Sequence, residues 1–139
     1  MLYSKMMEAA RSRVQQYLQS GAMVRPMDTV CVIYTQSGRV YSGMSHTSLH
    51  RGQVMVTHAE VEAVQNMLAF HETSIQVIML LNAYTGKPML PCTDCIRYII
   101  SLKPENSECQ IMLNQSSVSI SEINVASNVQ YAARPNFVQ

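Results

Sequence analysis

Residues 58–102, HAEVEAVQNMLAFHETSIQVIMLLNAYTGKPMLPCTDCIRYIISL, decide the fold of this chain. The apolar positions of residues 59–70 and of residues 92–102 recur at helical spacing. Between them, residues 75–81 form an almost continuous apolar run, which is typical of a central strand covered on both faces. The stretch therefore predicts a buried helix, a central strand and a second helix, in that order.

The segments on either side continue this alternation of helices and strands. Residues 3–19 carry apolar side chains at the spacing of an amphipathic helix, and residues 29–35 and 39–44 predict a hairpin that turns at Gly38. Residues 110–113 predict a final strand. The predicted fold class is α/β, a three-layer α/β/α arrangement around a mixed central sheet, with the element order α-β-β-α-β-α-β.

Two segments lack a clear helix or strand pattern. Residues 45–53 are polar and hold two histidines and a glycine, so we expect a loop there, and loops often line functional sites. Residues 114–139 form a polar tail with too little apolar surface to offset its ordering entropy if it folded alone. The 139 residues fit one domain, 1–139, with its core over 1–113.

The charge of the chain favours a small ligand over a polyanion. Charged residues make up 14% of the sequence and the formal net charge is +1, so no strong long-range field would attract nucleic acid or an acidic membrane surface. No stretch approaches the roughly 20 apolar residues that cross a bilayer. Residues 1–13 carry charges where a signal peptide needs an apolar run. We therefore expect a cytoplasmic protein with a small-molecule substrate, no membrane partner and no nucleic-acid partner.

The four cysteines divide into two pairs. Cys31 and Cys109 lie in apolar runs and are expected to be small core side chains. Cys92 and Cys95 form a CxxC motif at the start of a predicted helix. Without a secretory signal the thiols should stay reduced, so this second pair is available to bind a metal.

A second motif, His58-Ala59-Glu60, opens the other helix, and Pro91 precedes the CxxC pair. Either motif alone is weak, because HxE occurs by chance and CxxC also occurs in redox pairs and zinc ribbons. Together, HxE followed by PCxxC is the signature of zinc deaminases. Both motifs lie at predicted helix N-termini, where backbone N–H groups and the helix dipole favour the thiolates that zinc needs.

The residue types fit a catalytic zinc site. One imidazole, from His58, and two thiolates, from Cys92 and Cys95, fill three tetrahedral positions and leave the fourth for water. Two thiolates cancel the charge of the ion, which still acts as a Lewis acid and lowers the pKa of its water toward neutrality. Glu60 lies two residues after His58 on the first helical turn, where it is spaced to carry protons rather than to bind the metal.

Over residues 6–113 the sequence resembles the cytidine deaminase superfamily. The resemblance rests on the two motifs, the order of the elements, the hairpin that turns at Gly38 and a length typical of small nucleoside deaminases. It implies the cytidine-deaminase-like fold with one zinc ion per chain. It also implies a reaction in which a zinc-bound hydroxide attacks the ring carbon that bears an exocyclic amine, while Glu60 carries a proton to the departing ammonia.

The residues expected to hold the substrate depart from the pattern of that superfamily. Nucleoside-specific members place an asparagine and a glutamate just after the hairpin, and the corresponding positions here are Ser45 and Thr47. Met27 stands where members place an aromatic residue before the first strand. The candidate substrate-binding residues are Ser45, Thr47, Ala59, Met27 and Phe137. Because the resemblance supports deamination more than cytidine itself, the predicted substrate is a cytidine-like nucleoside or a related aminated heterocycle.

The resemblance also implies assembly. Small nucleoside deaminases form homo-oligomers in which neighbouring subunits help to close each site, often with an aromatic residue near the C-terminus. Phe137 is the candidate for that role, and a tetramer is the expected state. The alternative is a tail that stays unordered with Phe137 exposed, since chain ends are commonly poorly ordered.

Two other functions are compatible with the motifs. One is a deaminase that acts on a base within tRNA or single-stranded DNA, although an aromatic content of 6% and the near-neutral charge offer few stacking or cationic contacts. The other is a non-catalytic zinc-binding scaffold, which the changes at Ser45 and Thr47 favour and the intact Glu60 opposes. Ammonia release from aminated heterocycles would separate an enzyme from a scaffold, and salt-sensitive binding of tRNA would favour the nucleic-acid deaminase.

Overall fold

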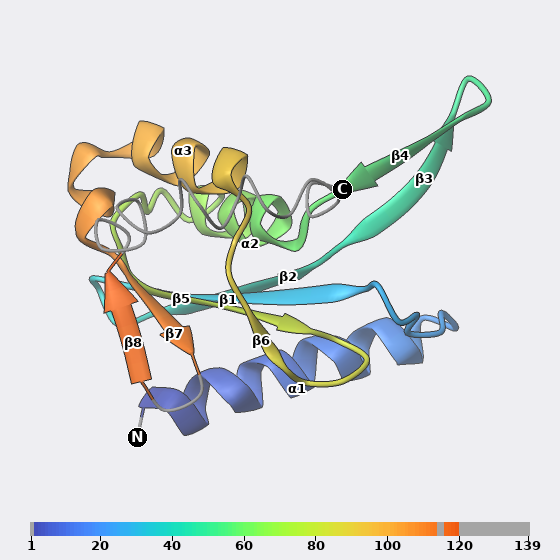
Figure 1. Ribbon diagram of the computed structural model, residues 1–139, viewed down its shortest axis with the longest axis horizontal. Coiled ribbons are helices and arrows are strands. Elements are labelled where there is room, and N and C mark those ends of the chain that lie inside the picture. The colour runs from blue at the N-terminus through green and yellow to red at the C-terminus, as the bar shows by residue number, and fades with distance from the viewer. Residues whose placement is uncertain (1, 114–115, 120–139) are drawn as a thin grey trace.

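A mixed β-sheet forms the centre of the computed structural model, which describes residues 2–113 and 116–119 (Figure 1). Within these residues the sheet has six strands: β1 (Thr29–Thr35), β2 (Val40–Met44), β5 (Ile75–Asn82), β6 (Pro88–Met89), β7 (Gln110–Leu113) and β8 (Ser116–Ser119). The strand order is β2-β1-β5-β7-β8, and β6 pairs with β5. Strand β1 runs antiparallel to both neighbours, whereas β5 and β7 are parallel, so the predicted mixed sheet is confirmed.

Helices cover both faces of this sheet. Helix α1 (Leu2–Gln19) lies along one face, and α2 (Ala59–Leu68) and α3 (Thr93–Leu102) lie along the other (Figure 1). A short 3-10 helix, η1 (Pro104–Glu108), follows α3. None of the helices in the described part of the chain is long and apolar enough to span a membrane. The predicted three-layer α/β/α class is confirmed.

Alternate residues of β5 enter two separate cores. Ile78 and Leu80 pack in the core that includes α2 and α3, and Val77 and Met79 pack in the core that includes α1. All four are buried, which confirms the prediction of a central strand covered on both faces. Burial of each such side chain stabilises the fold by about 1.5–3 kcal/mol relative to an exposed position. The strand that separates the two site helices in sequence is therefore held from both sides.

Gly43 on β2 lets α2 pack closely on the sheet. A Cβ atom at this position would lie 2.5 Å from the backbone nitrogen of Ala63 and 2.9 Å from the carbonyl oxygen of Ala59. Both atoms belong to the backbone of α2, so they cannot move aside without shifting the helix. The missing side chain at Gly43 thus determines how near the start of α2 comes to β2.

The segment 45–53, which was expected to be a loop, forms most of a hairpin. Strands β3 (His46–His50) and β4 (Gln53–Thr57) pair antiparallel and project from the body of the molecule (Figure 1). The turn residues Arg51 and Gly52 have φ angles of 52° and 79°, as in the two-residue turns that match the twist of paired strands. The loop prediction is wrong because this hairpin packs against little else, so no buried face imposes a regular apolar alternation.

Strand β8 lies within residues 114–139, for which the sequence predicts a polar tail. It pairs antiparallel with β7, and residues 116–119 therefore add an edge strand to the sheet. Residues 120–139, including the candidate Phe137, lie outside the described residues.

Candidate active site

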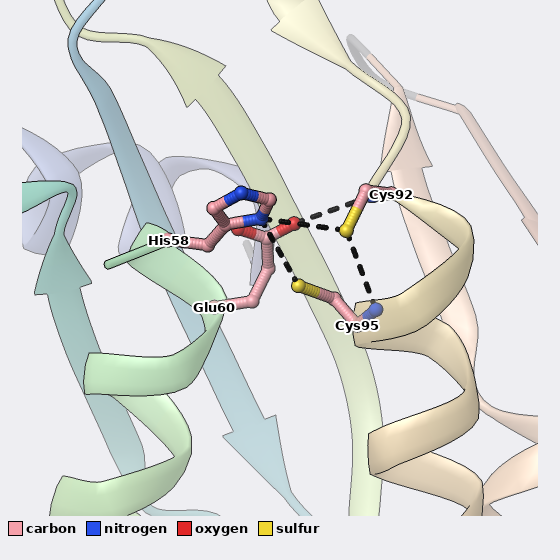
Figure 2. A group of neighbouring side chains, drawn as sticks. All are labelled: His58, Glu60, Cys92 and Cys95. Carbon is pink, nitrogen blue, oxygen red and sulfur yellow. Dashed lines mark hydrogen bonds between the residues drawn. The ribbon is translucent and has the colours of Figure 1, made fainter. Parts of the chain in front are cut away.

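Two helix N-termini bring the candidate metal ligands together. His58 is the N-cap of α2 and Cys92 is the N-cap of α3, both with extended backbone angles. Cys95 lies in the first turn of α3, and its backbone N–H donates to Cys92 Sγ at 3.3 Å. Figure 2 shows His58 and Glu60 extending from α2 toward the two cysteines of α3. The structure thus brings together the four residues that the two motifs singled out.

The donor atoms fit a zinc ion. His58 Nδ1 lies 3.4 Å from Cys92 Sγ and 3.4 Å from Cys95 Sγ, and together with a Glu60 carboxylate oxygen these atoms all lie within 4.8 Å of one another. Zn–S bonds of about 2.3 Å and Zn–N bonds of about 2.0 Å place two tetrahedral donors about 3.5 Å apart. The cluster therefore matches zinc in both chemistry and spacing, with one ion per chain.

The two clustered thiols differ in their affinity for a proton. The Cys95 thiol donates to Cys92 and, with the Cys95 backbone N–H, lowers the pKa of Cys92 to about 6, although burial opposes this shift. The same thiol hydrogen bond, together with burial, raises the pKa of Cys95 well above its usual range. The hydrogen bond between the two thiols thus favours the thiolate of Cys92, and thiolate is the form that binds metal.

Glu60 is a buried carboxylate beside the donor cluster. The residue is only 3% exposed, and its Oε2 accepts the backbone N–H of Cys92 at 3.4 Å. Burial of an ionisable group is costly unless the group is hydrogen-bonded or paired. A carboxylate at this place is therefore poised to interact with a cation or to exchange a proton with a ligand.

A pocket of about 540 Å³ opens next to the cluster. Its wall includes every clustered residue except Cys95, together with the predicted substrate residues Met27, Ser45 and Thr47. No Phe, Tyr or Trp side chain lines it within the described part of the chain. The volume falls in the range of sites that bind small molecules.

Both hydroxyl groups predicted to meet a substrate already have partners. Ser45 Oγ accepts the backbone N–H of Thr29 at 3.0 Å, and Thr47 Oγ1 accepts from the guanidinium of Arg25 at 3.0 Å. Since a hydroxyl has one donor in addition to its lone pairs, Ser45 and Thr47 can still each donate to a ligand. Met27 adds an apolar side chain that is 69% exposed.

Several pocket residues could not be found from the motifs. Arg25 and Asp28 come from the connection before β1, and Val54 and Val56 come from the hairpin strand β4. Their sequence neighbourhoods carry no periodic pattern that would place them at a site. Asn82, at the end of β5, also lines the pocket, but its amide donates to the Pro26 carbonyl.

The other two predicted substrate-binding residues, Ala59 and Phe137, are not found in the wall of the pocket that the described residues form. Ala59 is fully buried in the core and is not part of the pocket wall. Phe137 lies outside the described residues. Substrate contact by either residue stays a prediction.

The other two cysteines belong to the core, which confirms the prediction for them. Cys31 and Cys109 are both buried in the core that includes α2 and α3. Burial raises the pKa of both thiols, that of Cys109 to about 12. Neither thiol belongs to the metal-type cluster found among the described residues.

Fold and site together define a class of protein: a three-layer α/β/α domain with a zinc-type histidine and cysteine donor set beside a small pocket. In a comparison with sequence profiles of protein families, residues 3–112 match the family described as the cytidine and deoxycytidylate deaminase zinc-binding region. This chain belongs to that family. A comparison with curated protein sequences finds no significant match.

Solved structures share the fold over nearly the whole chain. The cytidine deaminase from Mycobacterium leprae is 13% identical, with a TM-score of 0.69 over 88% of this chain and 97% of its own. The cytidine deaminase from Burkholderia pseudomallei is 20% identical, with a TM-score of 0.66 over 88% and 96% of the two chains. The cytidine deaminase from Bacillus anthracis is 11% identical, with a TM-score of 0.64 over 95% and 97%. These TM-scores establish a common fold, and at such low sequence identities the substrate has to be argued from the pocket.

Proposed function

We propose that this chain is a zinc-dependent hydrolase that releases ammonia from a cytidine-like nucleoside or a related aminated heterocycle. The proposal is carried by the buried Glu60 carboxylate, which lies within 4.8 Å of His58 Nδ1 and both clustered sulfurs in the wall of a pocket. A zinc site that only stabilised a fold would have no use for an acid–base residue at that place. The three solved structures described above are cytidine deaminases, which agrees with this assignment.

In the proposed reaction, water adds to the ring carbon that bears the amine, and the C–N bond then breaks to give a carbonyl and ammonia. His58, Cys92 and Cys95 would hold the zinc ion, which when bound would supply the Lewis acidity that makes water nucleophilic near neutral pH. Glu60 accepts a proton from the attacking water and returns a proton to the departing amine. The backbone N–H of Cys92 donates to Glu60 Oε2, which holds the carboxylate beside the donor cluster.

The pocket suits a free heterocycle better than a base within a polynucleotide. Its volume of about 540 Å³ is that of a small-molecule site. Leu80, Met89 and Val56 give it apolar walls that can cover the faces of a ring. A polynucleotide would need cationic contacts along its backbone, and the net charge of the chain is only +1.

The direct test is ammonia release by zinc-loaded protein from a panel of aminated pyrimidines, aminated purines and their nucleosides. We expect turnover of at least one compound and its loss in a Glu60→Gln variant that retains zinc. Fully zinc-loaded protein that deaminates none of them would contradict the proposal and favour a non-catalytic scaffold. Binding of tRNA that weakens steeply with added salt would favour the nucleic-acid deaminase instead.

We further propose that the protein is a single-domain, cytoplasmic homo-oligomer, with a tetramer as the state that the resemblance implies. The exposed apolar side chains of the β3–β4 hairpin support assembly: Leu49 is 76% exposed and Val54 is 66% exposed. Monomeric proteins rarely expose several neighbouring large apolar side chains. A second copy of the chain that packs on this hairpin would cover them.

A further inference from the structure

We propose that Arg25 makes the pocket selective for heterocycles that carry an oxyanion, either a carboxylate or a phosphate; this inference rests on the proposed deaminase function. Arg25 lies in the connection between α1 and β1, outside both sequence motifs. It nevertheless lines the same pocket as His58 and Glu60. The pocket therefore has a cationic side chain in addition to its metal-type cluster.

The guanidinium, rather than the neighbouring carboxylate, is the charge that a ligand would meet. Asp28 Oδ2 accepts the backbone N–H of Arg25 at 2.8 Å, and Asp28 Oδ1 accepts from Arg25 Nη2 at 3.4 Å. The Asp28 side chain is 6% exposed, whereas that of Arg25 is 54% exposed. Asp28 thus holds Arg25 in place with both oxygens while the cation faces open space.

Arg25 retains hydrogen-bond donors for a ligand. Its Nη2 donates to Thr47 and to Asp28, and no partner of Nε or Nη1 is found in the part of the chain that the structure describes. A guanidinium carries five N–H donors in a planar fork that matches two oxygens of a carboxylate or phosphate. The donors left over are therefore suited to an oxyanion more than to a neutral hydroxyl.

Arg25 and three residues of the metal-type cluster line one pocket of about 540 Å³, which is the size of a site for one small ligand. Arg25 contacts Thr47, which pairs with Val56 across the hairpin. Val56 precedes His58 by two residues, so Arg25 and Thr47 lie beside the strand that leads directly into the metal-type cluster. A ring placed at Glu60 can carry its anionic substituent to Arg25, which also keeps that anion away from the Glu60 carboxylate.

The test compares three cytosine compounds: cytidine, cytidine 5′-monophosphate and (cytosin-1-yl)acetic acid. The kcat/KM of each is measured with zinc-loaded wild type, Arg25→Gln and Arg39→Gln. Arg39 is a matched control, because it is 63% exposed, lies 3.9 Å from the Glu72 carboxylate and does not line the pocket. Binding of the same compounds to the zinc-loaded Glu60→Gln protein, with and without Arg25→Gln, is measured by calorimetry and needs no turnover.

We expect the kcat/KM of one anionic compound to exceed that of cytidine by at least tenfold. Arg25→Gln should lower this preference roughly 10- to 100-fold, mainly by raising KM, as expected for the loss of a charge-assisted hydrogen bond. The compound that is preferred distinguishes a phosphate from a carboxylate. Arg39→Gln should preserve the preference, and both variants should keep the melting temperature of the wild type within a few degrees.

Equal binding of cytidine and both anions, a preference that survives Arg25→Gln, or an equal loss in Arg39→Gln would each overturn the role of Arg25. If cytidine is still deaminated when one of these results is obtained, the proposed deaminase function stands and only the role of Arg25 is withdrawn. Conversely, if anions bind through Arg25 but are never deaminated, the oxyanion-binding site is supported and the proposed deaminase function is refuted.

Discussion

The hydrogen bond between Cys92 and Cys95 shifts the pKa values of the two thiols in opposite directions. The Cys95 thiol and N–H lower the pKa of Cys92, so the thiolate form of Cys92 is favoured. The raised pKa of Cys95 means that its proton leaves when the metal binds. Because both sulfurs bind zinc as thiolates, we expect zinc binding to release protons and to weaken as pH falls.

Removal of either clustered thiol should remove the metal. In Cys92→Ala or Cys95→Ala we expect zinc to fall from about one ion per chain to a small fraction, because two protein ligands hold zinc far less tightly than three. Elemental analysis of the purified proteins measures this. Cys109→Ala, which removes a buried thiol outside the cluster, should keep its zinc. Full zinc in both cluster variants would contradict the assignment of these ligands.

Replacement of the Glu60 carboxylate should separate catalysis from metal binding. In Glu60→Gln we expect the zinc content and fold to be retained and kcat to fall by at least ~10²-fold, the usual contribution of a general acid–base group. Steady-state kinetics on the substrate found in the ammonia screen measures the change. The control is Glu72→Gln, which alters an acid that does not line the pocket. An equally active Glu60→Gln protein would remove this residue from the proposed proton transfer.

At the level of elements, one carboxylate ties together three segments around the site. Glu62 on α2 accepts from Arg13 of α1 at 2.9 Å and from the backbone N–H of Met44 on β2 at 2.6 Å, and it contacts His46 Nε2 at the start of β3. Burial tends to raise the pKa of Glu62, but the hydrogen bonds from His46, Met44 and Arg13 outweigh it and lower the pKa. The charged form of Glu62 thus fixes where the hairpin leaves the sheet.

The lowered pKa of Glu62 predicts a stability difference that depends on pH. A carboxyl with a lower pKa in the folded state stabilises the fold above its unfolded pKa, and this contribution is lost as pH falls through the folded value. Glu62→Gln should therefore reduce the free energy of unfolding by about 1–2 kcal/mol at pH 7 and by much less near pH 3. Urea denaturation of both proteins at each pH measures the difference.

The matched control for this experiment is Glu105→Gln. Glu105 lies 3.9 Å from Lys103 and its side chain is 70% exposed, so the substitution should change stability little at either pH. If Glu62→Gln lowers the free energy of unfolding by the same amount at pH 7 and near pH 3, packing and not the charge of Glu62 holds these segments together.

How well each element could be predicted from the sequence depended on how deeply it is buried. Strand β5 was predicted closely because both of its faces are covered and its apolar run shows this directly. The β3–β4 hairpin was missed because it is exposed and carries no regular pattern. The site divides in the same way: His58 and Cys92 are N-caps whose motifs are local in sequence, whereas Arg25 reaches the pocket only through the tertiary fold.

For the whole molecule, the exposed apolar hairpin predicts self-association. We expect light scattering to give the mass of an oligomer, a tetramer by the proposed assembly, and Leu49→Ser to shift it toward smaller species because Leu49 is among the most exposed apolar side chains. The control is Thr85→Ala, which changes an exposed residue far from the hairpin in sequence. A monomer mass at high concentration would refute the assembly.

Truncation after Arg134 should raise KM without loss of zinc if Phe137 contributes to a neighbouring site.

His58 precedes β5 in the sequence and Cys92 follows it, so a metal ion bound by both would act as a cross-link in the fold. An ion bound by both His58 and Cys92, 34 residues apart, closes a loop that contains the central strand, and the unfolded chain has no equivalent site. Free zinc at a hundred times its dissociation constant would then add about 2.7 kcal/mol to the free energy of unfolding. The folded fraction of this protein in a cell should therefore follow the supply of zinc, so that metal starvation lowers the amount of folded protein.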